Sequence, residues 1–228
     1  MNKQEKLARL CMAILGVLVG GISVGFFRVA MFGSDPFQCF VAGVDSAVWL
    51  SFGTVYMLMN MVLFGVMFFF GKRYIGIATF INLFLLGYVV EWSEAAILSV
   101  VGDPTVVIRS GCLLIGVVVL CFASAVYFTA DLGVSTYDAV ALMLAERSKI
   151  PFQVCRVGTD LICVAIGLGM GTVIGVGTLV TAFFMGPLIG VFRKQVTEPF
   201  LAQYQKEDNT HGRTNTPQAS GTLQRNPS

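Results

Sequence analysis

The sequence matches itself when it is shifted by 100 residues, and this internal repeat constrains the fold more than any other feature. Identical residues occupy the same place in both halves at Arg9/Arg109, Gly16/Gly116, Val17/Val117, Val19/Val119, Ala30/Ala130, Gly33/Gly133, Phe52/Phe152 and Gly71/Gly171. After a one-residue gap the match continues at Gly76/Gly175, Thr79/Thr178, Phe84/Phe183 and Gly87/Gly186. Repetition at a fixed offset is the signature of a duplicated unit. We therefore predict two copies of one structural unit.

Both copies are too apolar to fold in water. Hydrophobic residues make up 56% of the chain and charged residues 12%, and the mean hydropathy is +0.79. A helix needs roughly 20 apolar residues to cross about 30 Å of hydrocarbon. Runs of this length predict membrane spans at 10–32, 52–70, 75–97, 110–130, 152–171 and 174–192. Because each copy has an odd number of spans, the second copy must be inverted, as in many secondary transporters.

The predicted fold is an all-α polytopic membrane protein with six transmembrane helices in two inverted three-helix repeats. Its expected parts are a cytoplasmic N-terminus (1–9), the first repeat (10–97), an extracytoplasmic connector (98–109), the inverted second repeat (110–195) and a cytoplasmic tail (196–228). The tail is polar and cannot bury enough apolar surface to order itself, so we expect it to be disordered.

Basic residues are divided unevenly between the two ends of the predicted spans. One end carries Lys3, Lys6, Arg9, Lys72, Arg73, Arg147, Lys149, Arg156, Arg193 and Lys194. The opposite end carries Arg28 and Arg109, together with Glu94 and Asp103. The positive-inside rule therefore places both termini in the cytoplasm.

Each half carries a further short helix between its first and second spans. Apolar residues recur at helical spacing at 37, 40, 41 and 44 and again at 137, 140, 141 and 144. Ser34 or Asp35 can cap the first short helix, with Pro36 at its first position, and Ser135 with Asp138 forms a capping-box pattern in the second. These helices either lie flat at the membrane interface, which the length of span 10–32 favours, or dip inward and direct their N-termini at a central cavity.

Polar residues within the spans are functional candidates, because an unpaired charge at membrane depth is energetically costly. Asp160 lies near the middle of the fifth span, and its repeat counterpart Asn60 lies near the middle of the second. Under inverted symmetry we expect these two residues to approach each other near the midplane. Arg156 lies one turn before Asp160 and can pair with it, either to orient a solute or only to fix helix packing.

The remaining polar residues each have two interpretations. Arg28 either reaches the outer headgroups or pairs with Asp35 or Glu91. Glu91 is either an interface group or a proton-binding carboxylate, and the matched residues Asn82 and Thr181 either line a path or join helices by hydrogen bonds. The candidate substrate- or ion-binding residues are Asn60, Asp160, Arg156, Arg28, Asp35, Glu91, Ser135 and Asp138.

The sequence argues against an enzyme. It lacks His-Glu-x-x-His, Gly-x-Ser-x-Gly and P-loop motifs. Its one histidine, His211, lies in the polar tail, and its six cysteines include no Cys-x-x-Cys pair. No basic patch is interleaved with exposed aromatic residues. We therefore expect no catalytic residue, no metal, no cofactor and no nucleic-acid partner.

The apolar part of the chain, roughly residues 8–195, resembles the YczE/YyaS/YitT-like bacterial membrane proteins. The resemblance rests on Arg9 with the small-residue first helix, on Phe-Gly-Ser-Asp-Pro-Phe at 32–37 and on Asp-Leu-Gly-Val-Ser-Thr-Tyr-Asp at 131–138. It implies a multi-pass, transporter-like protein of the bacterial plasma membrane and assigns no binding residue.

The leading functional hypothesis is a small secondary transporter or permease with its site between the two repeats. Expected partners are the lipid bilayer and a small polar or anionic solute, and a homo-oligomer remains an open alternative. In this hypothesis Arg28 and Arg156 orient an anionic group, and Asp160 or Glu91 takes up protons. The alternative is a non-transporting accessory or regulatory subunit of another membrane or biosynthetic complex, which predicts no polar cavity between the halves. A third hypothesis, a channel, requires a continuous polar pore.

Overall fold

The computed structural model describes residues 3–33, 35–172 and 175–201, and the regular elements within them are all helical. Their order is α1 (Lys3–Ala30), α2 (Pro36–Ala47), α3 (Phe52–Phe70), the 3₁₀ turn η1 (Lys72–Tyr74), α4 (Ile77–Val101), α5 (Val106–Ala130), α6 (Thr136–Ser148), α7 (Phe152–Gly169), α8 (Val176–Phe192) and the π-helical turn η2 (Arg193–Thr197). The predicted all-α fold is confirmed over these residues.

Within the described part of the chain, four helices are long and apolar enough to cross a membrane. They cover Gln4–Ala30, Phe52–Phe70, Ile77–Val101 and Val106–Ala130. The other two predicted spans, 152–171 and 174–192, coincide with the shorter helices α7 and α8. At 1.5 Å per residue these two helices are each about 26 Å long, slightly less than the hydrocarbon thickness.

The central connector is shorter than the predicted range 98–109. Helix α4 continues to Val101 and α5 already begins at Val106, so only four residues separate them. Gly102 ends α4 with a positive φ of 66°, a backbone conformation that glycine adopts without strain. The prediction erred because hydropathy marks where the apolar run ends, whereas a helix can continue into the polar layer.

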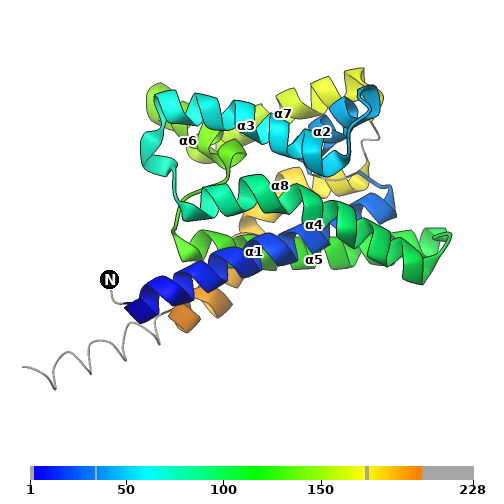
Figure 1. The fold of residues 1–228 in the computed structure, drawn as a ribbon, viewed down its shortest axis with the longest axis horizontal. Coiled ribbons are helices and arrows are strands. Elements are labelled where there is room, and N and C mark those ends of the chain that lie inside the picture. Colours follow the sequence, from blue (N-terminus) through cyan, green and yellow to red (C-terminus); the bar gives the residue numbers. More distant parts are fainter. Residues whose placement is uncertain (1–2, 34, 173–174, 202–228) are drawn as a thin grey trace, which may run out of the picture.

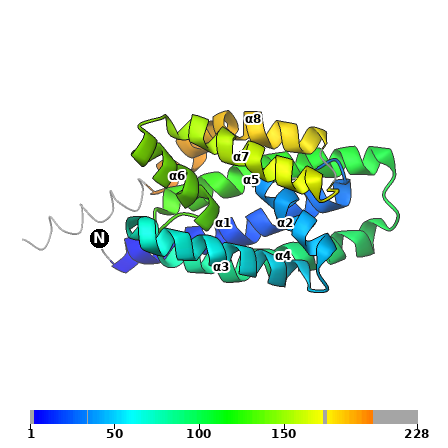
Figure 2. The same ribbon diagram turned by 90° about the horizontal axis from the view of Figure 1, so that it is seen from above.

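The helices form two layers (Figures 1 and 2). One layer contains α1, α4, α5 and α8, in which α1 packs most extensively against α5 and α4. The other contains α2, α3, α6 and α7, in which α2 packs on α7 and α6 on both α3 and α7. Small residues allow the close packing of the first layer, since a Cβ atom at Gly16 would lie 2.9 Å from the Tyr127 Cβ.

Each half of the chain packs against the start of the last helix of the other half. The Gly177 amide donates to the Phe32 carbonyl at 2.8 Å, and the Ala78 amide donates to the Leu132 carbonyl at 3.1 Å. The chain turns beside these bonds at Gly33 and Gly133, whose φ angles are 85° and 114°. These two crossings between the halves are equivalent under the sequence repeat. Leu132 is the counterpart of Phe32, and Gly177 is the counterpart of Ala78.

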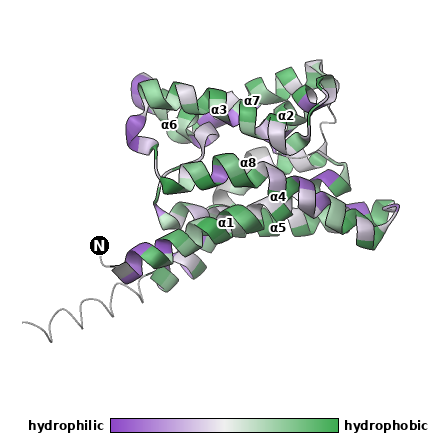
Figure 3. Ribbon diagram, viewed as in Figure 1, coloured by the Kyte–Doolittle hydropathy of each residue, from purple (hydrophilic) through white to green (hydrophobic). Residues whose placement is uncertain are grey.

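Charged side chains link several elements at one end of the fold. Arg9 donates to the Ala130 carbonyl at 3.1 Å, so the start of α1 contacts the end of α5. Arg73 pairs with Glu146, and the Arg147 guanidinium lies 4.6 Å from the centre of the Phe70 ring. Figure 3 shows hydrophilic residues at this end and largely apolar helix surfaces between the ends, a pattern typical of a membrane protein.

The helical chain extends beyond the predicted start of the tail at residue 196. Turn η2 follows α8 directly, and the helix resumes to Leu201, which is buried. The hydroxyl groups of Thr129 and Thr197 lie 2.6 Å apart, which ties this segment to the end of α5. Residues 202–228, where the disordered tail was predicted, lie outside the described part of the chain.

Candidate functional site

A cavity of about 440 Å³ lies between the two helix layers. Helices α1, α4, α5 and α8 line one side, and α2, α3, α6 and α7 line the other. Its size is within the range of small-molecule sites. Most of its wall is apolar, and its polar groups gather where α2 and α6 begin.

The starts of α2 and α6 are buried in the protein interior. Phe37 and Tyr137, in the first turns of these helices, stack with ring centres 4.8 Å apart and planes inclined by 17°. These two residues are counterparts in the sequence repeat. Of the two predicted arrangements, the structure matches inward-dipping helices, although the length of the first span favoured the flat one.

Both helix starts are capped as their sequences predict. The Gln38 amide donates to Asp35 Oδ1 at 3.2 Å, with Pro36 at the first helical position. The Asp138 amide donates to the Ser135 hydroxyl at 3.1 Å, and that hydroxyl in turn donates to Asp138 Oδ2 at 2.7 Å. Ser34, the other predicted cap, lies outside the described residues.

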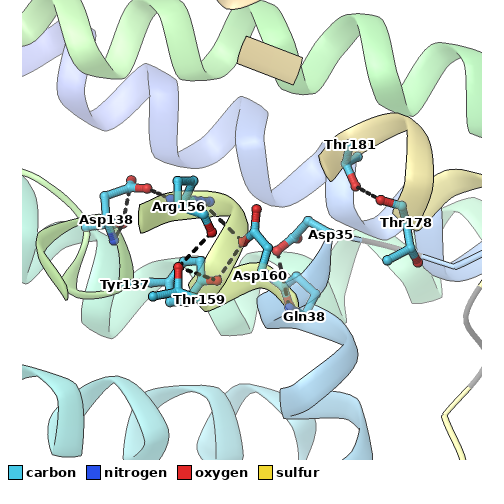
Figure 4. Close-up of polar contacts among 10 residues, drawn as sticks. Asp35, Gln38, Tyr137, Asp138, Arg156, Thr159, Asp160, Thr178 and Thr181 are labelled. Atoms are coloured by element: carbon cyan, nitrogen blue, oxygen red, sulfur yellow. Dashed lines mark hydrogen bonds and ion pairs between the residues drawn. The ribbon is translucent and has the colours of Figure 1, made fainter. Parts of the chain in front are cut away.

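Arg156 lies at the centre of a charged cluster on the cavity wall (Figure 4). Its guanidinium pairs with Asp138 from α6 and, at 3.3 Å, with Asp160 one turn further along α7. The Tyr137 hydroxyl donates to Asp160 at 2.6 Å, and the guanidinium lies 4.5 Å from the centre of the Tyr137 ring. The predicted pairing of Arg156 with Asp160 is therefore present, and a second carboxylate joins it.

Asp35 lies beside this cluster at the start of α2 (Figure 4). Burial raises the pKa of its carboxyl group above the ordinary value, while the Gln38 amide and the positive charge of Arg156 act in the opposite direction. Among the residues that the structure describes, no cation lies within ion-pair distance of Asp35. Its carboxyl group is thus close to the cavity and lacks a cationic partner there.

Asn60 forms no direct hydrogen bond with Asp160 among the described residues, although we expected the two residues to approach each other. Its amide nitrogen donates to the Tyr56 carbonyl at 2.8 Å, and its amide oxygen accepts a hydrogen bond from Thr136 at the start of α6. Asn60 is fully buried and is not part of the cavity wall. Its role in the fold is to hold α6 against α3.

This role gives a stability prediction for Asn60→Ala. The substitution removes both hydrogen bonds and leaves the Thr136 hydroxyl buried without this acceptor, so we expect it to lower the unfolding free energy by about 2 kcal/mol. A matched control is Asn82→Ala, since the hydrogen bond of Asn82 within the described structure is a weak one of 3.4 Å from the Tyr56 hydroxyl. Unfolding in a detergent titration measures both losses, and equal losses would contradict the proposed role of Asn60.

Arg28 and Glu91 also lie away from the cavity wall. Arg28 pairs with Glu94, which is neither of the two partners predicted for it, and its guanidinium lies 4.1 Å from the centre of the Phe52 ring. Glu91 accepts a weak bond from the Gly53 amide at 3.4 Å. Their spacing along the sequence indicated polar groups at membrane depth, but it could not indicate which helix face each one occupies.

The sequence prediction missed three residues that line the cavity. Tyr137 was assigned only to an apolar helix face, and Tyr127 and Gln38 were not considered. Both Gln38 Oε1 and the Tyr127 hydroxyl are buried without a hydrogen-bond partner among the described residues. The two tyrosines could have been found from the sequence, because a tyrosine in an apolar segment needs a hydrogen-bond partner for its hydroxyl group when it is buried. Asn82 and Thr181 do line the cavity, which agrees with one of their two interpretations.

Metal binding has no support from the described side chains. No group of three or more histidine, cysteine, aspartate or glutamate residues among them is arranged to hold a metal ion. The described cysteines are free thiols.

Sequence comparisons connect the chain to several bacterial proteins. It is 25% identical over 191 residues to the uncharacterized membrane protein YczE of Bacillus subtilis, and the aligned region covers 82% of this chain and 86% of that protein. It is 20% identical over 189 residues to the uncharacterized protein YyaS of the same organism, covering 83% and 94%. An uncharacterized protein of Haemophilus influenzae is 24% identical over 122 residues, covering 53% and 54%.

No solved structure matches the fold. A protein-family model, described as a family of unknown function (DUF6198), matches residues 7–194. The predicted resemblance to YczE and YyaS is thereby confirmed, and the chain belongs to this family of unknown function.

Proposed function

We propose that the protein is a small secondary transporter whose solute binds in the cavity between the two helix layers. The observation that carries this proposal is the meeting of two inward-pointing helix starts at the polar groups of a largely apolar cavity. Repeat-built transporters bind their solutes near the membrane midplane, where interrupted helices present their N-termini. The accessory-subunit alternative predicts no such cavity, so the cavity favours transport.

The transporter proposal includes six membrane-crossing helices in two inverted repeats. The paired crossings at Phe32–Gly177 and Leu132–Ala78 support it, because the sequence offset relates one crossing to the other. The basic residues at the start of α1 and the ends of α3 and α6 support a cytoplasmic location for both termini of a bacterial plasma-membrane protein.

Alternating access in this proposal moves one layer against the other. Rocking of a whole repeat as one body would break the hydrogen bonds that join each half to the last helix of the other. The chain passes between the layers in the connections from α1 to α2, from α3 to α4, from α5 to α6 and from α7 to α8. Positive φ angles at Met31, Gly33, Asp131, Gly133 and Gly171 concentrate in these segments, which makes them the natural hinges.

Two-sided thiol labelling tests the proposal without knowledge of the solute. In a variant without the native cysteines, Ser124→Cys places a thiol on the cavity wall, and Lys72→Cys, Lys149→Cys and Ser99→Cys place thiols at the two ends. A membrane-impermeant maleimide is applied to intact cells and to inside-out vesicles. Alternating access predicts that Ser124→Cys is labelled in both preparations.

The end positions serve as the topology controls. Lys72→Cys and Lys149→Cys are expected to react only in inside-out vesicles, and Ser99→Cys only in intact cells. Labelling of Lys72→Cys and Lys149→Cys from opposite sides would refute the inverted repeats. Labelling of Ser124→Cys from one side only, or from neither, would contradict alternating access.

A further inference from the structure

We infer that the cavity binds a small organic cation, namely a protonated amine on an apolar body, with the Asp35 carboxylate as its counter-ion. The inference rests on the proposed function, because it names the solute class of the same cavity. It replaces the anionic solute that the arginine residues suggested at first.

The charge balance of the cavity wall is negative. Its described ionisable carboxyl groups are Asp35, Asp138 and Asp160, whereas Arg156 is the one described basic residue. The starts of α2 and α6 each add about half a positive charge from the helix dipole. An excess of about one negative charge remains when the carboxyl groups are ionised, which favours a cation over an anion in the cavity.

Arg156 is already neutralised by the protein. Asp138 and Asp160 approach its guanidinium from two different helices. An anionic solute would have to displace one of these carboxylates and leave it buried without a partner, which is costly. Asp35, by contrast, forms no ion pair among the described residues, so an ammonium group could pair with it without breaking an existing ion pair.

Two unpartnered polar atoms on the cavity wall indicate that something else completes their hydrogen bonds. Gln38 is 5% exposed and Tyr127 is 6% exposed, yet the amide oxygen of Gln38 and the hydroxyl of Tyr127 lack partners among the described residues. Buried polar groups are almost always paired in native proteins. An ammonium group donates up to three hydrogen bonds, and the Gln38 oxygen, the Tyr127 oxygen and the Asp35 carboxylate are acceptors.

The rest of the wall fits an apolar body. Aromatic residues on it include Phe37, Tyr56, Tyr127, Phe128 and Tyr137. Aromatic ring faces attract cations, and the guanidinium of Arg156 above Tyr137 shows this contact within the cavity itself. A volume of about 440 Å³ leaves room for a ring-sized group beside the ammonium.

Three probes with one common body test the charge preference. Phenethylammonium, 3-phenylpropionate and 2-phenylethanol share a phenylethyl group and differ in the charge of the head group. Equilibrium binding of radiolabelled phenethylammonium to the detergent-purified full chain is measured, with the other two as competitors. We expect the ammonium probe to bind at least about tenfold more tightly than either competitor, equivalent to about 1.4 kcal/mol.

Asp35→Asn tests the counter-ion. Asparagine caps a helix as well as aspartate does, so the variant retains the start of α2 while it loses the charge. We expect its affinity for phenethylammonium to fall at least about tenfold. The matched control is Asp103→Asn, because Asp103 is exposed in the connection between α4 and α5, outside the cavity. This control is expected to bind the probe as the unchanged chain does.

Four results would overturn the inference: tighter binding of 3-phenylpropionate, equal binding of all three probes, no binding of phenethylammonium at millimolar concentration, or an unchanged affinity in a folded Asp35→Asn variant. The labelling experiment separates this inference from the transport proposal. Specific amine binding with one-sided labelling of Ser124→Cys supports the cation site and contradicts transport. Two-sided labelling of Ser124→Cys without amine binding supports transport and contradicts the cation site.

Discussion

Gly76→Ala is expected to lower the unfolding free energy by more than about 3 kcal/mol, at the upper end of overpacking effects. A Cβ atom at Gly76 would lie 1.8 Å from the Leu132 carbonyl oxygen. The glycine has an extended backbone with φ of −144°, which any residue can adopt, so the loss is purely steric. The clash is with backbone atoms that no side-chain rotation can move, and it also disrupts the adjacent bond from Ala78 to Leu132.

Gly175→Ala provides the matched second test. At this repeat counterpart an added Cβ would lie 2.1 Å from the Phe32 carbonyl oxygen, so we expect a loss of similar size. Gly65→Ala is the control, since nothing lies within 4 Å of that position in α3. Alanine there is expected to stabilise the helix by up to about 1 kcal/mol. Denaturant titration of the purified variants measures all three effects, and similar values for Gly76→Ala and Gly65→Ala would contradict the close crossing.

The second large effect is expected at Arg156→Leu. This substitution leaves Asp138 and Asp160 facing each other without their shared cation, and breaking a buried ion pair of this kind costs about 3–5 kcal/mol. Because Arg156 is 24% exposed, we expect a loss of about 3 kcal/mol. The measurement is again the unfolding free energy in a detergent titration.

Two further variants identify the cause of that loss. Adding Asp138→Asn and Asp160→Asn to Arg156→Leu removes the unpaired charges and is expected to restore part of the stability. Arg193→Leu breaks an ion pair with Glu198 in which both side chains are about half exposed. Such surface pairs contribute less than about 1 kcal/mol, so a loss at Arg193 as large as that at Arg156 would show that the charge cluster is not responsible.

Hydropathy and helix-capping residues predicted most of the helical elements, because both signals are local in the sequence. Helix α3 begins and ends at the predicted residues 52 and 70, and the caps at Asp35 and Ser135 are present. The lengths of α1 and α4 were underestimated, since polar residues such as Lys3 and Glu5 extend a helix beyond its apolar run without appearing in a hydropathy window.

The site was predicted only in part, because an offset between repeats does not reveal which counterpart residues lie near a symmetry axis. Asn60 and Asp160 were chosen for their matching chemistry. In the structure Asn60 binds Thr136 and Asp160 binds Tyr137, so each is held by α6. The counterparts that do meet are Phe37 and Tyr137. Their stacking depends on how far both short helices penetrate, which is a tertiary property that no local pattern encodes.

The crossings between the two halves also have a consequence for biosynthesis. The Ala78 amide at the start of α4 finds its partner, the Leu132 carbonyl, only after the ribosome has added more than fifty further residues. At a synthesis rate of about 5–20 residues per second, the first half waits in the membrane for several seconds before it can finish folding.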